Sequence, residues 1–226
     1  MNKNLTMSEI SPINLGRQLR KPSGELGLKV AENMNSANNA IYDFVLSKIE
    51  IKDNDKILEI GFGNGKSISK FFEINPNLQF SAIDFSETMC AEATILNKGL
   101  IEGKKLNISC QDAVSMSFQN DFFDKVVAIN VIYFWEHIDR QLQEIKRVLK
   151  KGGQLVIGYR PKSIMINLPF TQEVFKHYDP EDLQLLMREN GFEIIKEETQ
   201  LSAIKVVDGS EVQVVDICLI AEKIEN

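Results

Sequence analysis

One stretch decides the fold of this chain: Lys56-Ile57-Leu58-Glu59-Ile60-Gly61-Phe62-Gly63-Asn64-Gly65-Lys66-Ser67. Its pattern predicts a short apolar strand over residues 57–60, a tight turn with three alternate glycines, and a helix over residues 66–73. Glycine suits such a turn because it adopts backbone angles that a Cβ forbids and lets a ligand approach the main chain. This order of strand, turn and helix predicts a nucleotide-binding site.

The spacing of the turn discriminates between nucleotides. The dinucleotide fingerprint G-x-G-x-x-G is one residue longer than the G-x-G-x-G found here. The NTPase loop G-x-x-x-x-G-K-[ST] matches Gly65-Lys66-Ser67 at its end, but position 60, where its first glycine belongs, is Ile. Glu59 would repel a pyrophosphate and would attract an ammonium or sulfonium group. The charge therefore favours a cationic nucleoside.

Four blocks in order resemble one known family. Residues 57–65 are similar to the first motif of the class I S-adenosylmethionine-dependent methyltransferases, an apolar strand with an acid followed by G-x-G-x-G. Residues 80–84 resemble its second strand, which ends in an acid 19 residues after Gly65. Residues 111–113 resemble the end of the third strand, and residues 147–157 resemble the R-x-L-K-x-G-G segment before the fifth. The match covers roughly residues 35–223.

The resemblance implies S-adenosyl-L-methionine as cofactor and a set of residues that bind it. Asp84 would hold the ribose hydroxyls, although an acid in this place could instead cap the next helix. Asp112 would meet the adenine amino group, and Met89 would lie against the adenine or pack in the core. The complete cofactor set is Glu59, Gly61, Gly63, Gly65, Asp84, Phe85, Met89, Asp112, Ala113 and Asn130.

The methyl acceptor is expected at the carboxyl ends of the strands, where open α/β sheets bind ligands. Tyr133 and His177 are candidate catalytic residues, although a lone histidine is more often structural. Residues 160–179 resemble the family's variable cap, and residues 34, 35 and 38 are candidates for its lid. Core packing or an ordinary helix surface is the alternative for several of these positions. The candidate substrate-binding residues are Met34, Asn35, Trp135, Arg160, Phe175 and Tyr178.

The order of the predicted elements implies an α/β, Rossmann-like three-layer sandwich. Its sheet is expected to have seven mostly parallel strands with an antiparallel last strand. Residues 1–50 are predicted to form an N-terminal arm and lid helices, and residues 51–226 the methyltransferase domain. In the first part we expect a partly mobile arm to about residue 24, then helices broken near residues 33–39, which include four asparagines. The last two strands are predicted to be joined by a turn at Asp208 and Gly209.

Composition predicts one cytoplasmic domain of 226 residues with a full core. A net charge of −6 gives no general attraction to nucleic acid. The polar N-terminus lacks a signal peptide, and the longest apolar run, residues 126–135, is too short to span a membrane. With two histidines and no C-x-x-C, no metal site is expected. We expect the three cysteines, Cys90, Cys110 and Cys218, to be buried small hydrophobes in a reducing compartment.

The predicted function is methyl transfer from S-adenosylmethionine to a small molecule by in-line displacement. Because such a reaction requires no particular side chain, a non-catalytic protein that binds the cofactor or serves as an accessory subunit is an alternative. A nucleotide- or NAD-utilising enzyme is a weaker one. No motif indicates the acceptor, the atom that is methylated or the oligomeric state.

Overall fold

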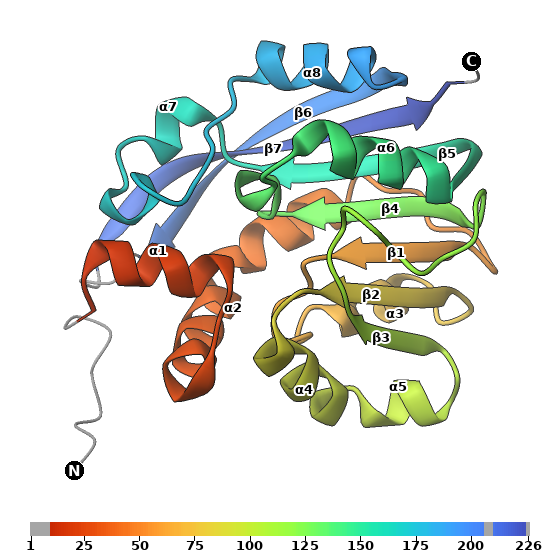
Figure 1. The fold of residues 1–226 in the computed structure, drawn as a ribbon, viewed down its shortest axis with the longest axis horizontal. Coiled ribbons are helices and arrows are strands. Elements are labelled where there is room, and N and C mark those ends of the chain that lie inside the picture. Colours follow the sequence, from red (N-terminus) through yellow and green to blue (C-terminus); the bar gives the residue numbers. More distant parts are fainter. Residues whose placement is uncertain (1–9, 206–209, 225–226) are drawn as a thin grey trace.

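The computed structural model describes residues 10–205 and 210–224, which form an α/β sandwich around a seven-stranded sheet (Figure 1). The strand order is β3-β2-β1-β4-β5-β7-β6, in which β7 runs antiparallel to the other six strands. The strands are β1 (Lys56–Ile60), β2 (Gln79–Asp84), β3 (Leu106–Cys110), β4 (Phe123–Ile129), β5 (Leu149–Tyr159), β6 (Phe192–Lys205) and β7 (Glu211–Lys223). The predicted fold class is confirmed.

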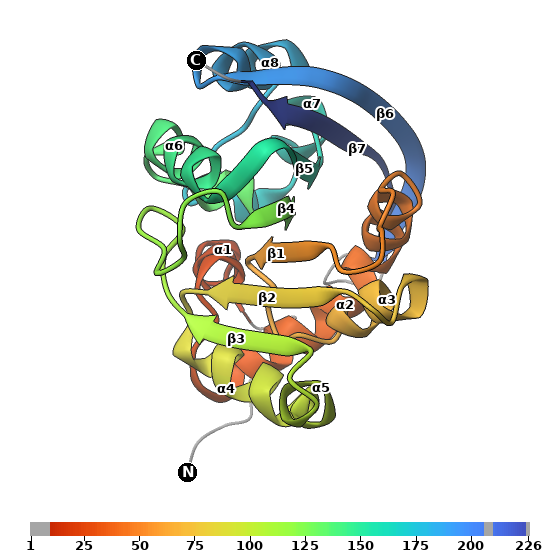
Figure 2. The same cartoon turned by 90° about the vertical axis from the view of Figure 1, so that its right-hand side faces the viewer.

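Helices cover both faces of the sheet and enclose two apolar cores. Figure 2 shows α3 and α6 on opposite sides of the strands. One core contains α6 and α8, and the other contains α2, α3 and α4. The helices are α1 (Pro12–Arg20), α2 (Gly24–Leu46), α3 (Ile68–Ile74), α4 (Glu87–Leu96), α5 (Lys98–Glu102), α6 (Ile138–Val148), α7 (Lys162–Met165) and α8 (Pro180–Glu189), with short 3-10 turns at Ile132–Phe134 and Pro169–Thr171.

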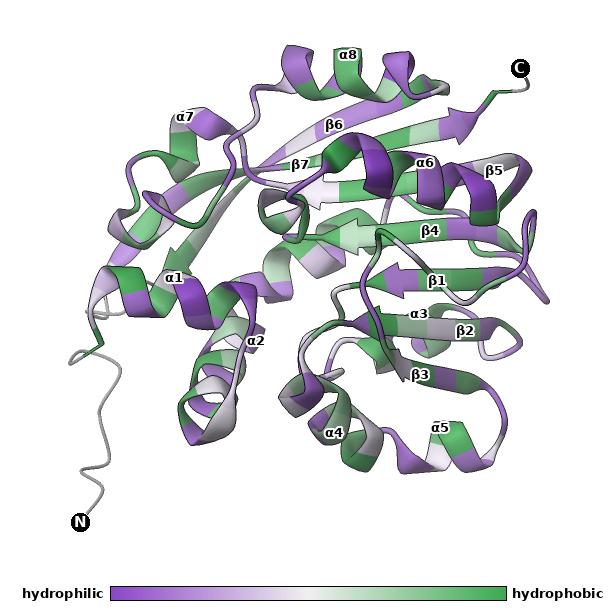
Figure 3. Ribbon diagram, viewed as in Figure 1, coloured by the Kyte–Doolittle hydropathy of each residue, from purple (hydrophilic) through white to green (hydrophobic). Residues whose placement is uncertain are grey.

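The central strands are apolar because helices pack on both of their faces. In Figure 3 the middle strands carry mostly hydrophobic residues, whereas the helices alternate between hydrophobic and hydrophilic ones. Val126, Val127 and Ala128 of β4 are fully buried. Strands β1 and β5 run parallel to β4 on either side of it, so the carboxyl ends of all three strands lie at the same end of the sheet, beside α1 and α2 (Figure 1).

The expectation of an irregular arm to about residue 24 was wrong for residues 12–20, which form α1. Ser11 caps this helix by accepting a hydrogen bond from Asn14 N at 3.3 Å, and Pro12 occupies its first turn. Leu15 and Gly16 are buried against the 3-10 turn Pro169–Thr171, and a Cβ on Gly16 would lie 2.4 Å from Phe170 O. The Ser11-Pro12 pair is a local signal for the start of this helix, and burial of Leu15 and Gly16 stabilises it.

The break expected at residues 33–39 was also wrong, since α2 is continuous from Gly24 to Leu46. The asparagine side chains find partners that suit a helix. Asn33 donates to Lys29 O one turn back, at 2.9 Å, and Asn39 donates to the Asp43 carboxylate at 3.0 Å. Such contacts, with burial of the opposite face of α2, outweigh the low helix propensity of asparagine.

The remaining predicted strands and long helices are present, with small shifts at their ends. There are two exceptions. Strand β6, which was predicted over residues 192–199, continues to Lys205 because it pairs with β7 along its whole length, and β5, which was predicted to begin at residue 154, begins at Leu149. The predicted turn at Asp208 and Gly209 lies outside the described residues. Among the residues described, no helix combines the length and apolar character needed to cross a membrane.

Candidate functional site

The glycine turn connects β1 to α3, and all three of its glycines have positive φ: 75° at Gly61, 59° at Gly63 and 76° at Gly65. A Cβ on Gly61 would lie 2.5 Å from Val131 Cγ2, so close packing also requires glycine there. A Cβ on Gly63 would have no atom within 4 Å. The main chain at Gly63 is therefore open to a ligand.

Glu59 is buried in β1 directly before this turn. Tyr42 of α2 donates a hydrogen bond to its Oε1 at 2.8 Å, whereas its Oε2 is buried without a partner. Burial raises the pKa of Glu59 from 4.5 to about 7, although the Tyr42 hydrogen bond opposes this rise. The unpaired oxygen gives the protein a desolvated acceptor that a cationic donor would satisfy.

Asp84 ends β2 with its carboxylate beside the same turn. Its Oδ2 accepts a hydrogen bond from Gly63 N at 3.1 Å, and its Oδ1 accepts one from Ser86 N at 2.9 Å. Burial raises its pKa to about 6, opposed by these backbone hydrogen bonds. Ser86 rather than Asp84 caps α4, through a bond from Met89 N at 3.2 Å. The carboxylate of Asp84 thus braces the glycine turn.

The other predicted cofactor residues flank these two acids. Phe85 follows Asp84 and has the Lys21 ammonium 5.4 Å from its ring centre. Asp112 is exposed beyond β3 and accepts a hydrogen bond from Val114 N at 3.0 Å, while Ala113 is buried beside it. Met89 is fully buried in α4, which is the packing alternative considered for it.

Asn130 follows β4 and joins α2 to the end of the sheet. Its φ is 55°, an uncommon value for a residue other than glycine. Its Nδ2 donates to Asn38 Oδ1 of α2 at 2.9 Å, and its Oδ1 accepts from the Tyr133 hydroxyl at 3.1 Å. The Tyr133 hydroxyl in turn accepts from Arg160 N at 2.5 Å, and burial raises the pKa of this tyrosine. Tyr133 therefore stays protonated and orders the ends of β4 and β5.

Arg160 is buried at the end of β5 with an acidic partner. Its Nε donates to Asp216 Oδ1 of β7 at 2.8 Å, and its Nη2 donates to Ala37 O of α2 at 3.1 Å. The second oxygen of Asp216 accepts from Ser202 of β6 at 2.5 Å. The Arg160 side chain thus ties α2 to the edge of the sheet.

The predicted cap carries an aromatic cluster. Phe175 lies 4.6 Å from Phe134 and 5.5 Å from Tyr133, measured between ring centres, and Phe170 lies 6.0 Å from Phe175. Beside this cluster, three of the predicted residues have a buried polar atom without a protein partner: Trp135 Nε1, His177 Nε2 and Tyr178 Oη. Burial and the nearby Lys162 lower the pKa of His177, which leaves its imidazole neutral at pH 7.

Helix α1 and its connection to α2 lie across the strand ends. Arg20 forms an ion pair with Glu136 after β4, and the Ser86 hydroxyl donates to Pro22 O at 2.5 Å. Met34 and Asn35 lie half-buried on α2. These contacts bring the N-terminal segment, the loop after β4 and the start of α4 together at one end of the sheet.

Two partners in this region could not be identified from the sequence. Tyr42 and Asp216 were not candidates, since each lies in an ordinary helix or strand pattern without a motif. Their roles depend on contacts at sequence separations of 17 residues to Glu59 and 56 residues to Arg160. The available signal was an acid, Asp216, inside the otherwise apolar run 214–221, because a charge buried in such a run needs a partner.

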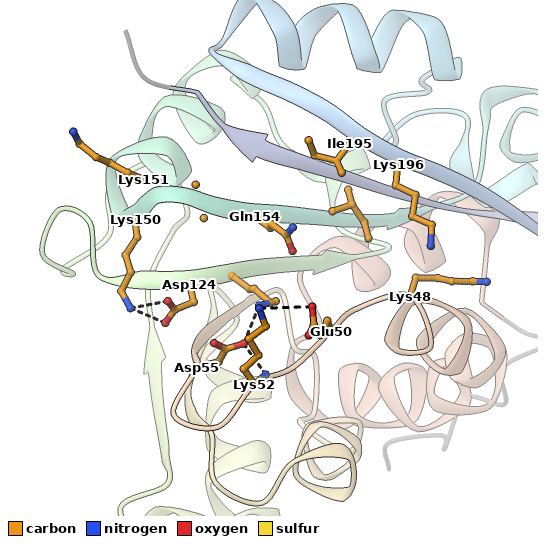
Figure 4. Close-up of a pocket in the computed structure, with 14 residues that line it drawn as sticks. Lys48, Glu50, Lys52, Asp55, Asp124, Lys150, Lys151, Gln154, Ile195 and Lys196 are labelled. Atoms are coloured by element: carbon orange, nitrogen blue, oxygen red, sulfur yellow. Dashed lines mark hydrogen bonds and ion pairs between the residues drawn. The ribbon is translucent and has the colours of Figure 1, made fainter.

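A depression of about 380 Å³ lies at the opposite ends of the strands, lined mainly by lysines and acids (Figure 4). Lys125 pairs there with Asp55 at 2.8 Å, and Lys150 pairs with Asp124 at 2.7 Å. It is separate from the glycine turn, since it adjoins the starts of β1 and β4. In the described part of the chain, no group of three or more metal-binding side chains occurs.

Comparison with known proteins finds a family model that matches part of this chain. Residues 58–157 match the family model described as "Methyltransferase domain". The uncharacterized methyltransferase YdaC of Bacillus subtilis is 27% identical over 57% of this chain and 69% of its own length. The phosphatidylethanolamine N-methyltransferase of Cereibacter sphaeroides is 30% identical over 52% of this chain and 62% of its own length.

A solved structure supports the fold over nearly the whole chain. The phosphoethanolamine N-methyltransferase 2 of Haemonchus contortus, in complex with phosphomonomethylethanolamine and S-adenosylhomocysteine, superposes with a TM-score of 0.72. It is 15% identical, and the match covers 96% of this chain and 61% of that one. The chain spans between 37% and 69% of the length of the curated relatives it matches.

Proposed function

We propose that this chain, which is similar to the S-adenosylmethionine-dependent methyltransferases, is a class I member that transfers a methyl group to a small-molecule acceptor by in-line displacement. The proposed acceptor class follows the relatives, one of which is named for a phospholipid amine. We further propose that residues 1–50 form an N-terminal arm and lid helices, of which α1 and α2 are the described part, and that residues 160–179 form its cap.

One observation carries this proposal: two buried carboxylates, Glu59 and Asp84, flank an open glycine turn. A cofactor with a sulfonium, an ammonium group and a ribose fits this arrangement. The unpartnered Glu59 Oε2 would accept from the cationic part, and Asp84 would accept from ribose hydroxyls. The open space at Gly63 leaves room for close approach to the main chain. A pyrophosphate would meet two negative charges, which disfavours NAD or ATP.

The work of the protein in this reaction is alignment and exclusion of water. The bound cofactor supplies an activated methyl group on a positively charged sulfur. Asn130, held by Asn38 and Tyr133, fixes the end of β4 where the acceptor would approach. The contacts of α1 with the cap would close the site against solvent. Holding two reactants in line can supply several kcal/mol of the barrier lowering, up to about 7–11 kcal/mol in the best cases.

The cap would select the acceptor. Phe134, Phe170 and Phe175 favour a molecule with an apolar or aromatic part beside the reacting atom. His177 is the candidate base, because a neutral imidazole can accept a proton from a hydroxyl or ammonium acceptor. Tyr133, the other candidate catalytic residue, keeps its proton because burial raises its pKa, and it donates that proton in a hydrogen bond to Asn130. It would therefore act by positioning Asn130.

Calorimetric titration with S-adenosylmethionine, S-adenosylhomocysteine, ATP and NAD tests the cofactor part of the proposal. We expect micromolar binding of the first two and none of the others; binding of ATP or NAD instead would refute it. Incubation of cell extract with methyl-labelled cofactor then tests transfer. Label in a low-mass fraction supports a small-molecule acceptor. Tight cofactor binding without any labelled product would favour the non-catalytic alternative.

A further inference from the structure

Cys110 departs from the expectation of buried cysteines, because it is exposed at the carboxyl end of β3. Alternate residues of a strand share one face of the sheet, so Cys110 lies on the face that carries Leu106 and Ile108. Leu106 and Ile108 belong to the core that α4 covers. The Cys110 thiol is therefore on the α4 side of the sheet while remaining accessible to solvent.

Cys90 is placed opposite it on α4. It is nearly buried in the same core, and its Sγ donates a hydrogen bond to Asp84 O at 3.4 Å. Asp84 of β2 is also the residue that pairs with Cys110 of β3 in the sheet. The residue after Cys110, Gln111, donates its backbone N–H to Asp84 O at 3.0 Å, the carbonyl oxygen that also accepts from Cys90. Both cysteines thus adjoin one backbone position, and the neighbouring Cys110 thiol adds to the effect of burial in raising the pKa of Cys90.

We propose that Cys90 and Cys110 are an oxidation site at which a peroxide forms a disulfide that ties α4 to β3 and weakens cofactor binding. The effect on binding rests on the proposed function, because it acts through Asp84 and the start of α4. The disulfide consumes the thiol hydrogen that Cys90 donates to Asp84 O. It also constrains α4, whose N-cap residue, Ser86, lies two residues after the proposed ribose acid Asp84.

The chemistry balances with hydrogen peroxide as the oxidant. The accessible Cys110 thiolate attacks one peroxide oxygen, the O–O bond breaks, and one water leaves as Cys110 becomes a sulfenic acid. The Cys90 sulfur then attacks the Cys110 sulfur, the S–O bond breaks, and a second water leaves with the Cys90 proton. Burial raises the pKa of Cys90 to about 12, so it reacts second, as the resolving thiol. Two thiols and one peroxide give one disulfide and two waters.

The test uses the full chain, reduced and then freed of reductant. Peroxide should lower the titratable thiols of the denatured protein from three to one and the intact mass by about 2 Da. Peptide mapping should join Cys90 to Cys110. The dissociation constant for S-adenosylmethionine should rise at least about fivefold, the lower end of ordinary coupling between sites, and a thiol reductant should reverse this.

Matched variants separate the pair from the remaining cysteine. Cys110→Ser should bind the cofactor normally and lose its response to peroxide, whereas Cys218→Ala, a change at a buried residue of β7, should respond like the wild type. Added oxygen on Cys110 with Cys90 still free would overturn the proposal, as would a disulfide that leaves affinity unchanged. If the reduced protein does not bind the cofactor, the proposed function fails, while mass and thiol counting still decide whether the disulfide forms.

Discussion

Replacing Glu59 by Gln should make the free protein less sensitive to alkaline pH. In the folded chain burial raises the pKa of Glu59 from 4.5 to about 7. The folded protein therefore binds a proton at the Glu59 carboxyl group more tightly than the unfolded chain does. Protonation of Glu59 therefore stabilises the folded state; this contribution to the unfolding free energy is complete below about pH 4.5 and is lost as the pH rises through about 7.

The size of this effect follows from the two pKa values. A tenfold difference in proton affinity corresponds to about 1.4 kcal/mol, so a pKa of about 7 instead of 4.5 amounts to about 3 kcal/mol in total. Between about pH 5 and about pH 8, roughly 2.5 kcal/mol of the unfolding free energy should be lost through this group. Glu59→Gln keeps an acceptor for Tyr42 and cannot ionise, so this part of the pH dependence should disappear.

Urea unfolding at the two pH values measures the difference directly. The wild type should lose about 2 to 3 kcal/mol more than Glu59→Gln between them, because groups that do not interact with Glu59 titrate equally in both proteins and cancel. The charge of Asp84 contributes to the raised pKa of Glu59, so the measured difference includes the interaction between these two acids. Glu193→Gln, a change at an exposed position of β6, is the matched control and should behave as the wild type. Equal losses in the wild type and Glu59→Gln would refute the assignment of a buried, ionising carboxyl. In calorimetry Glu59→Gln should also bind S-adenosylmethionine more weakly.

Three further changes test other parts of the site. Asp84→Ala should weaken cofactor binding by about tenfold or more, because hydrogen bonds to a charged group contribute about 1.5 to 3 kcal/mol each; unchanged affinity in calorimetry would remove this residue from the site. Replacing Phe175 and His177 together by Ala should abolish methyl transfer from labelled cofactor and spare cofactor binding. If both properties were lost, the cap would be structural. Asp216→Ala should destabilise the protein by about 3 to 5 kcal/mol in urea unfolding, because Arg160 would remain buried without its partner. A loss below about 1 kcal/mol would mean that solvent already reaches the pair.

The sequence by itself determined the order of the elements and the cofactor motif. The apolar strand before Gly61 and the turn glycines follow from backbone geometry that acts over a few residues. The acid that ends β2, 19 residues after Gly65, also came from local pattern and spacing. Signals of this kind need no knowledge of distant contacts, and they sufficed for the seven-stranded sheet.

Tertiary structure decided what surrounds these motifs. The asparagine-rich part of α2 stays helical because one face of the helix is buried against the sheet, and Asn38 there accepts a hydrogen bond from Asn130, 92 residues away. The charge of Arg160 is neutralised by Asp216, a residue that belongs to no sequence motif. The proposed disulfide likewise depends on the fold, which places Cys90 of α4 beside Cys110 of β3. Each outcome depends on burial and on partners brought together by the completed sheet. Local propensity does not contain that information, because the free energy of a buried polar group is set by its partner.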